Sequence, residues 1–216
     1  MTNIERWAKG VVPDQFGLAG IALRPLSLGH WVALARIGSP FVLGGDIGSA
    51  GLGDLTAAVL VCSRPWDAAW RSFGGGPAAR WRRWWVSVRL EVEFAGSLLG
   101  FVDWLRLQQA GPELWSDCSA GAESRGAPAV LVLVTTLMRG LGIGYREALS
   151  LSMAEALWLH WATVEGDGGT RIVSDDDRAV LAEAESIKND PARYEDLVAQ
   201  FAHVTGSLKG KAECGG

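Results

Sequence analysis

The densest group of aromatic side chains in this sequence is interleaved with arginine, in the run Arg80-Trp81-Arg82-Arg83-Trp84-Trp85. Indole and guanidinium groups together are typical of protein interfaces, of anionic lipid surfaces and of sites where single-stranded bases stack. The alternative interpretation is that the tryptophans belong to the core, while the arginines extend to solvent or pair with the acidic C-terminal third. The net charge of −4 disfavours lipid and nucleic acid, so the binding role we carry forward is a protein interface.

A glycine-rich segment, residues 44–53, precedes an expected helix, which is a position where backbone N–H groups can bind phosphate. The segment lacks the Gly-Lys-Ser/Thr ending of a phosphate loop and has no strand before it, and Asp46 and Asp54 would repel an anion. We therefore predict a linker at this position and no nucleotide site.

The three histidines, His30, His160 and His203, show none of the spacings that helical metal sites use. His160 lies between Trp158 and Trp161, which is typical of a histidine packed among aromatic rings or at an interface. We predict no metal site and no cofactor.

The sequence indicates no catalytic residues. Cys62 lies inside an apolar helical pattern, where a thiol is usually inert, and no Gly-x-Ser-x-Gly motif occurs. Asp175, Asp176 and Asp177 follow Ser174 as acids do in the first turn of a helix. An enzyme would need His160 or these three acids to meet in a concave pocket.

The segment that must position the tryptophans, residues 77–109, fits two patterns. Every second residue from Val86 to Phe94 is apolar, as in a half-buried strand. Apolar residues also recur at helical spacing from Trp81 to Leu105, which is a much longer span. Because no partner strand is evident elsewhere, the helix is favoured.

Capping residues mark several other helices. Ser27, Ser152 and Ser174 predict helix starts, and the first of these helices places Leu28, Trp31, Val32 and Ala35 on one apolar face. Pro65, Pro128 and Pro191 predict further starts.

We predict an all-α fold, with one helical domain of seven or eight helices, residues 27–205, packed around a long central helix. The remaining segments are an irregular or short-element N-terminal arm (1–26), a flexible loop within the domain (111–127) and a disordered tail (206–216).

Composition limits the class of protein. A chain of 216 residues with 49% hydrophobic and 20% charged residues can bury a core of its own. The three cysteines lack ligand spacing and predict free thiols in a reducing cytosol. Glu5, Arg6 and Lys9 interrupt the first residues, and the apolar run 129–138 is about half of the roughly 20 residues that span a bilayer. We expect a cytoplasmic protein with neither a signal peptide nor a membrane partner.

Two stretches are similar to a known family. The first is Ile21-Ala22-Leu23-Arg24-Pro25-Leu26-Ser27-Leu28-Gly29-His30-Trp31, followed by Ile37-Gly38-Ser39-Pro40-Phe41. The second is Gly142-Ile143-Gly144-Tyr145-Arg146-Glu147-Ala148-Leu149, followed by a helix start at Ser152 and an aromatic helix ending at Glu165. This layout resembles the tail assembly chaperones of tailed phages and prophages.

The resemblance implies a non-catalytic role in virion morphogenesis. Such chaperones hold the helical tape-measure protein in the bacterial host cytoplasm and assist tail-tube subunits. A structural virion component, such as a head-tail connector or tail-completion protein, is the alternative, and self-association into a homo-oligomer stays open. A chaperone of this kind needs a surface for amphipathic helices, and the candidates that we name for it are Arg80, Trp81, Arg83, Trp84, Trp85, Trp158 and Trp161.

Overall fold

The computed structural model describes residues 2–11, 16–44, 47–69, 73–115, 127–168, 170–190 and 195. This part of the chain holds ten α-helices, one short 3₁₀ helix and one two-stranded sheet, so the predicted all-α class is confirmed, with more helices than the seven or eight expected. The chain divides into two compact units, Met1–Ile172 and Val173–Gly216, which are described separately. The predicted tail lies outside the described residues, as does all but residue 195 of the helix expected after Pro191.

The N-terminal segment of the first unit consists of short elements. Helix α1 (Asn3–Val11) is followed by the antiparallel strands β1 (Phe16–Leu18) and β2 (Ile21–Leu23). Ala19 and Gly20 connect the strands with positive φ angles of 49° and 76°, the backbone that a tight two-residue hairpin turn requires. Leu18, Ile21 and Leu23 turn into the core, so the hairpin is anchored to the helices.

Helices α2 (Leu28–Arg36), α3 (Leu52–Cys62) and α4 (Trp66–Ala69) pack on one another, with a 3₁₀ turn (Ile47–Ser49) before α3. Ser27 caps α2 as predicted. The predicted apolar face of α2 is correct only in part, because Leu28 is buried and Trp31 packs against the core, whereas Val32 is exposed. The buried residues of α2 are Leu28, Gly29, His30, Ala33 and Leu34. Helix α2 contacts α3, α4, α7 and α8, and none of these contacts buries Val32.

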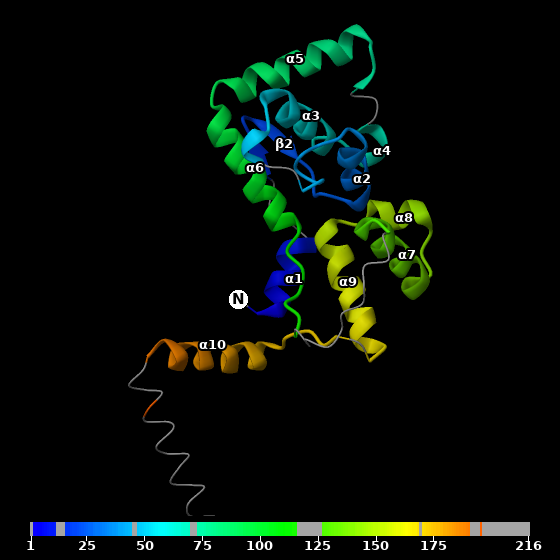
Figure 1. Ribbon diagram of the computed structural model, residues 1–216. Coiled ribbons are helices and arrows are strands. Elements are labelled where there is room, and N and C mark those ends of the chain that lie inside the picture. The colour runs from blue at the N-terminus through cyan, green and yellow to red at the C-terminus, as the bar shows by residue number, and fades with distance from the viewer. Residues whose placement is uncertain are drawn as a thin grey trace, which may run out of the picture. The chain divides into compact units, whose positions relative to one another are not determined.

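The expected long central helix is two helices, α5 (Pro77–Glu91) and α6 (Phe94–Gln108). The helix prediction for 86–94 is therefore confirmed for most of the segment, whereas the single continuous helix is wrong. Glu93 breaks it with φ −139° and ψ 59°. A straight helix over 77–108 would be roughly 48 Å long, and the bend lets α5 lie on α3 while α6 turns down along β1 (Figure 1).

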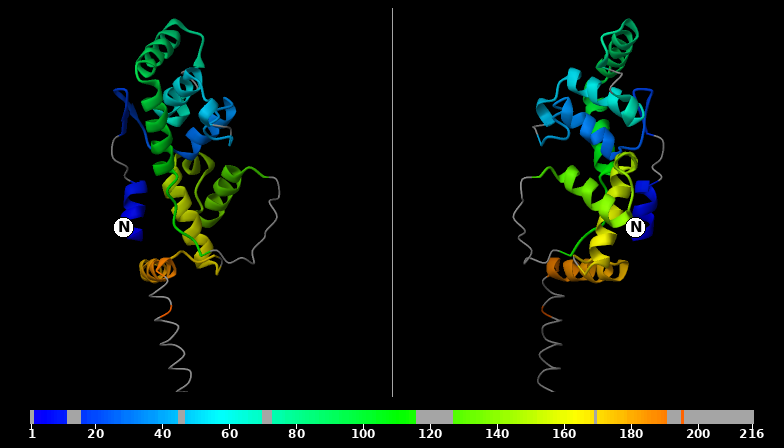
Figure 2. Two further views of the ribbon diagram at one scale, coloured as in Figure 1. Left: turned by 60° about the vertical axis from the view of Figure 1, so that its left-hand side comes forward. Right: turned by 90° about the vertical axis from the view of Figure 1, so that its right-hand side faces the viewer.

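The remaining helices of this unit are α7 (Ala129–Leu141), α8 (Tyr145–Ser150) and α9 (Met153–Gly166). Ser152 caps α9 through the Glu155 N–H at 3.1 Å, as its sequence predicts. Backbone hydrogen bonds from Leu28 to Leu151 and from Met153 to Leu26 join the starts of α2 and α9. Figure 2 shows α7 and α9 side by side, below the α2–α5 part of the unit.

The described part of the predicted loop, residues 111–115 and 127, lies outside any helix, and Leu114 forms a single bridge with Ile172. In the second unit, helix α10 (Asp175–Asn189) begins at Ser174. Ser174 and Asp177 form the predicted capping box, with reciprocal distances of 3.0 and 3.1 Å.

Candidate protein-binding face

Helix α5 is attached to α3 by a narrow inner stripe. Val86 and Leu90 are its buried side chains, exposed by 3% and 0%. They lie four residues apart, about one turn of helix, so they share one side of α5, and α3 is the main neighbour of this helix. No other side chain of α5 is buried.

The opposite side of α5 carries a second apolar stripe, which we name the outer stripe. Its members lie at positions i, i+3, i+4, i+7 and i+11, the spacing of one helical face. They are Trp81, Trp84, Trp85 and Val88, with Val92 as the residue directly after the helix, and they are exposed by 65, 54, 36, 41 and 85%. Helical spacing thus places apolar side chains on both sides of α5, and only the inner stripe is covered.

Contacts within the outer stripe hold its rings in place. The rings of Trp81 and Trp84 lie 4.8 Å apart between centroids. The Arg89 guanidinium lies 4.1 Å from the centre of the Trp85 ring and donates a hydrogen bond to the Ala19 carbonyl oxygen at 3.4 Å. The hairpin turn therefore fixes the Arg89 side chain, which in turn packs on Trp85 by a cation–π contact.

Arginines border the outer stripe on both sides. On a helical wheel of 100° per residue, Arg80 and Arg83 fall on one side of it, and Arg82 and Arg89 on the other. Arg80, Arg82 and Arg83 form no ion pair within the described part of the chain. These three charges are available to an acidic partner.

Two hollows run along the junction of α5 with α3. One, of about 580 Å³, is lined by Arg80, Arg83 and Trp84 together with Gly53 and Thr56 of α3. The other, of about 390 Å³, is lined on the α5 side by residues that include Trp81, Arg82 and Trp85. The face therefore presents a ridge of aromatic rings between two hollows, and side chains of a partner helix can fit into these hollows.

The two predicted tryptophans of α9 lie elsewhere, since α5 and α9 occupy different parts of the first unit (Figures 1 and 2). Trp158 is 9% exposed, and its Nε1 has no hydrogen-bond partner within the described residues. Its buried position does not fit a surface role, so we leave it out of the face. Trp161 is half-buried and lines a separate cavity.

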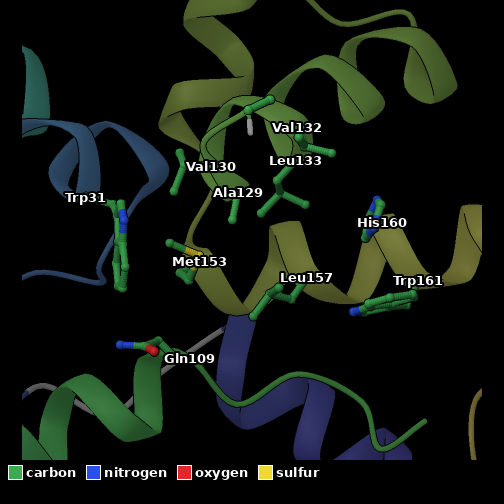
Figure 3. Close-up of a pocket in the computed structure, with 11 residues that line it drawn as sticks. Trp31, Gln109, Ala129, Val130, Val132, Leu133, Met153, Leu157, His160 and Trp161 are labelled. Carbon is green, nitrogen blue, oxygen red and sulfur yellow. The ribbon is translucent and has the colours of Figure 1, made fainter. Parts of the chain in front are cut away.

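This cavity, of about 530 Å³, opens between α2, α7 and α9 (Figure 3). Trp31, Val130, Leu133, Met153 and Leu157 give it an apolar wall, and the His160 ring packs edge-on against Trp161 at 4.8 Å. Burial lowers the pKa of His160, which favours the neutral ring. His160 is the one titratable residue in the lining, so the described residues bring no nucleophile or second acid to it.

The other candidates for chemistry have structural roles. Cys62 is fully buried, and burial raises the pKa of its thiol. Asp177 accepts the Ser174 N–H, and Asp175 pairs with Arg178 at 2.8 Å, so both act at the start of α10. Within the described ranges, no group of three His, Cys, Asp or Glu side chains could hold a metal ion.

His30 has a role that the sequence analysis missed. It occupies the third position of α2, where its Nδ1 accepts the Ser27 N–H at 3.1 Å. Its Nε2 lies 2.6 Å from the Arg64 carbonyl oxygen, which can only accept, so Nε2 carries the proton. The spacing Ser-x-x-His was a usable signal, because it matches a capping box with histidine in place of glutamate.

No family model, curated protein or solved structure matches this chain. Among the described helices, none combines the length and the apolar character needed to cross a bilayer.

Proposed function

We propose that this protein is a non-catalytic assembly chaperone of the tailed-phage type, acting in the bacterial host cytoplasm, which holds a helical partner on the outer stripe of α5. The observation that carries the proposal is the second apolar stripe of α5, with three exposed tryptophans at helical spacing. Amphipathic helices bind such surfaces through residues at i, i+3, i+4 and i+7.

The size of the stripe suits a partner that covers it along its length. From their exposed fractions, the three rings present roughly 230–390 Å² of surface. Full burial at about 25 cal/mol per Å² would contribute ~6–10 kcal/mol, whereas association costs about 4–15 kcal/mol. The rings alone therefore do not secure a complex, and the valines and arginines beside them must also take part.

The charges beside the stripe indicate the chemistry of the partner. Arg80, Arg82 and Arg83 would meet acidic side chains on both edges of an apolar ridge. A long helical protein such as a tape-measure protein offers repeated ridges of this kind, and the similarity of residues 21–41 and 142–165 to tail assembly chaperones favours it as the client over an unrelated helix.

Co-expression with a tape-measure protein and a tail-tube protein from a tailed phage tests the proposal. We expect the wild-type chain to co-purify with the tape-measure protein and to raise its soluble fraction. The variant Trp81→Ser/Trp84→Ser should lose most of this effect while keeping its far-UV circular dichroism, because both rings are exposed.

The matched control is Trp7→Ser on α1, which removes a 44% exposed tryptophan from another helix. It should hold the client as the wild type does. The proposal is wrong if the wild type gives neither co-purification nor added solubility, or if Trp7→Ser lowers both as much as the double variant does. Abundant protein in purified particles would favour a structural virion component instead, because a chaperone leaves before the particle is complete.

A further inference from the structure

Helix α10 is an acidic helix with an uncovered apolar ridge. None of its fifteen residues is buried. Val180 and Leu181 are exposed by 65% and 39%, and with Ala184 and Ile187 they share one side of the helix at positions i, i+1, i+4 and i+7. Among the described residues of the second unit, none covers this ridge.

Acidic residues border the ridge on both sides. On the same helical wheel, Asp176 and Glu183 fall on one side of Ala184 and Glu185 on the other. Three aspartates open the helix, and its two basic residues, Arg178 and Lys188, leave it with a net negative charge. α10 is therefore an acidic amphipathic helix, the type of partner that the α5 face fits.

The two helices are complementary in length, in side-chain size and in charge. Each has 15 residues. α5 offers large rings with arginines on both edges, and α10 offers aliphatic side chains around a small central alanine, with carboxylates on both edges. Opposite charges at the edges of an apolar contact favour one register and one partner over others.

We infer that α10 of one copy of this chain binds the outer stripe of α5 of a second copy. The inference rests on the proposed function to the extent that both use the same face of α5. Since each copy carries one α5 and one α10, such contacts either close into a dimer or continue head to tail. Self-association then covers the tryptophans until a client competes for them.

The first experiment is sedimentation equilibrium of the full chain over a hundredfold concentration range at physiological salt. We expect the mass of a dimer or a larger oligomer to appear as concentration rises. Two variants should remain monomeric at the same concentrations, namely Arg80→Glu/Arg82→Glu on α5 and Glu183→Lys/Glu185→Lys on α10. Each variant reverses one charge on either edge of its helix, and so sets like charges against one another.

Mixing the two variants is the decisive step. In the mixture, the glutamates on α5 of one protein face the lysines on α10 of the other, and the two unchanged helices also match, so association should return. The control Asp103→Lys/Glu147→Lys reverses two exposed acids outside both helices and should associate like the wild type. A wild type that stays monomeric throughout, or a mixture that stays monomeric, overturns the inference.

The α10 variant also separates this inference from the proposed function, because it leaves α5 unchanged. It should hold the tape-measure protein at least as well as the wild type does while failing to self-associate. Loss of self-association with retained client binding supports both proposals. Self-association without any client binding retains the contact between copies and removes the chaperone role.

Discussion

The stability of the protein should fall between pH 7 and pH 5, with His30 responsible for most of the fall. The pKa of His30 is lowered from 6.5 to about 4, mainly because the side chain is buried and to a smaller extent because of the positive charge of Arg24. Protonation of Nδ1 would also break its hydrogen bond with the Ser27 N–H, because that nitrogen would become a second donor. The folded chain therefore keeps His30 neutral.

The sign and size follow from the two pKa values. Between pH 6.5 and pH 4 the unfolded chain binds a proton at His30 that the folded chain does not, so acidification favours unfolding in this window. The stabilisation by neutral His30 is fully present above the unfolded pKa and is lost as the pH falls toward the folded one. Between pH 7 and pH 5 the loss in the free energy of unfolding is about 2 kcal/mol.

Urea unfolding at pH 7, 6 and 5 measures this loss, with His30→Gln as the test variant. Glutamine at this position can still accept the Ser27 N–H, as in a capping box, but leaves the Arg64 carbonyl unpaired. At pH 7 the variant should have a free energy of unfolding about 1–3 kcal/mol below that of the wild type. Between pH 7 and pH 5 this free energy should fall by about 2 kcal/mol less in the variant than in the wild type. His160→Gln, at a less buried site, should keep most of the slope. An unchanged slope in His30→Gln would refute the role assigned to His30.

Three further outcomes test the packing. In chemical denaturation, Leu90→Ala should lower the free energy of unfolding by about 2–5 kcal/mol and Val88→Ala by less than about 1 kcal/mol. Equal losses would mean that the inner and outer stripes are assigned wrongly. Gly29→Ala should lower the melting temperature, because a Cβ there would overlap the indole ring of Trp66, the first residue of α4. Gly53→Ala has open space around the new methyl group and should leave the melting temperature nearly unchanged in thermal melts. In a variant whose other cysteines are serine, Cys62 should react with a thiol reagent no faster than the chain unfolds, and rapid labelling of the native protein would contradict its burial.

Helix starts were predictable from the sequence because they depend on local chemistry. Ser27, Ser152 and Ser174 each cap the helix expected after them, since a side-chain oxygen and the N–H three residues on need no distant partner. The bend at Glu93 was not predictable in this way. Neither Val92 nor Glu93 is a helix breaker, and the apolar period continues across the bend, so the tertiary contacts of α5 and α6 decide it.

The candidate face was visible in the sequence only in part. Residue types and spacing placed Trp81, Trp84 and Trp85 together, because all three lie on one helix. Trp158 has the same residue type and also lies on a helix, yet it is buried. Exposure depends on which side of each helix a neighbour covers, and no local pattern in the chain carries that information.

Helix α5 turns its smaller apolar side chains inward and its largest outward. Burial alone would favour the reverse, because an indole ring removes more apolar surface from water than valine or leucine does. The arrangement gains stability only when a second surface covers the rings. If a client helix and α10 of a second copy both use this face, they exclude one another, and each lowers the apparent affinity of the other by the same factor. Self-association would then keep the tryptophans covered at high chain concentration, and a client would have to bind more tightly than α10 to release a free copy.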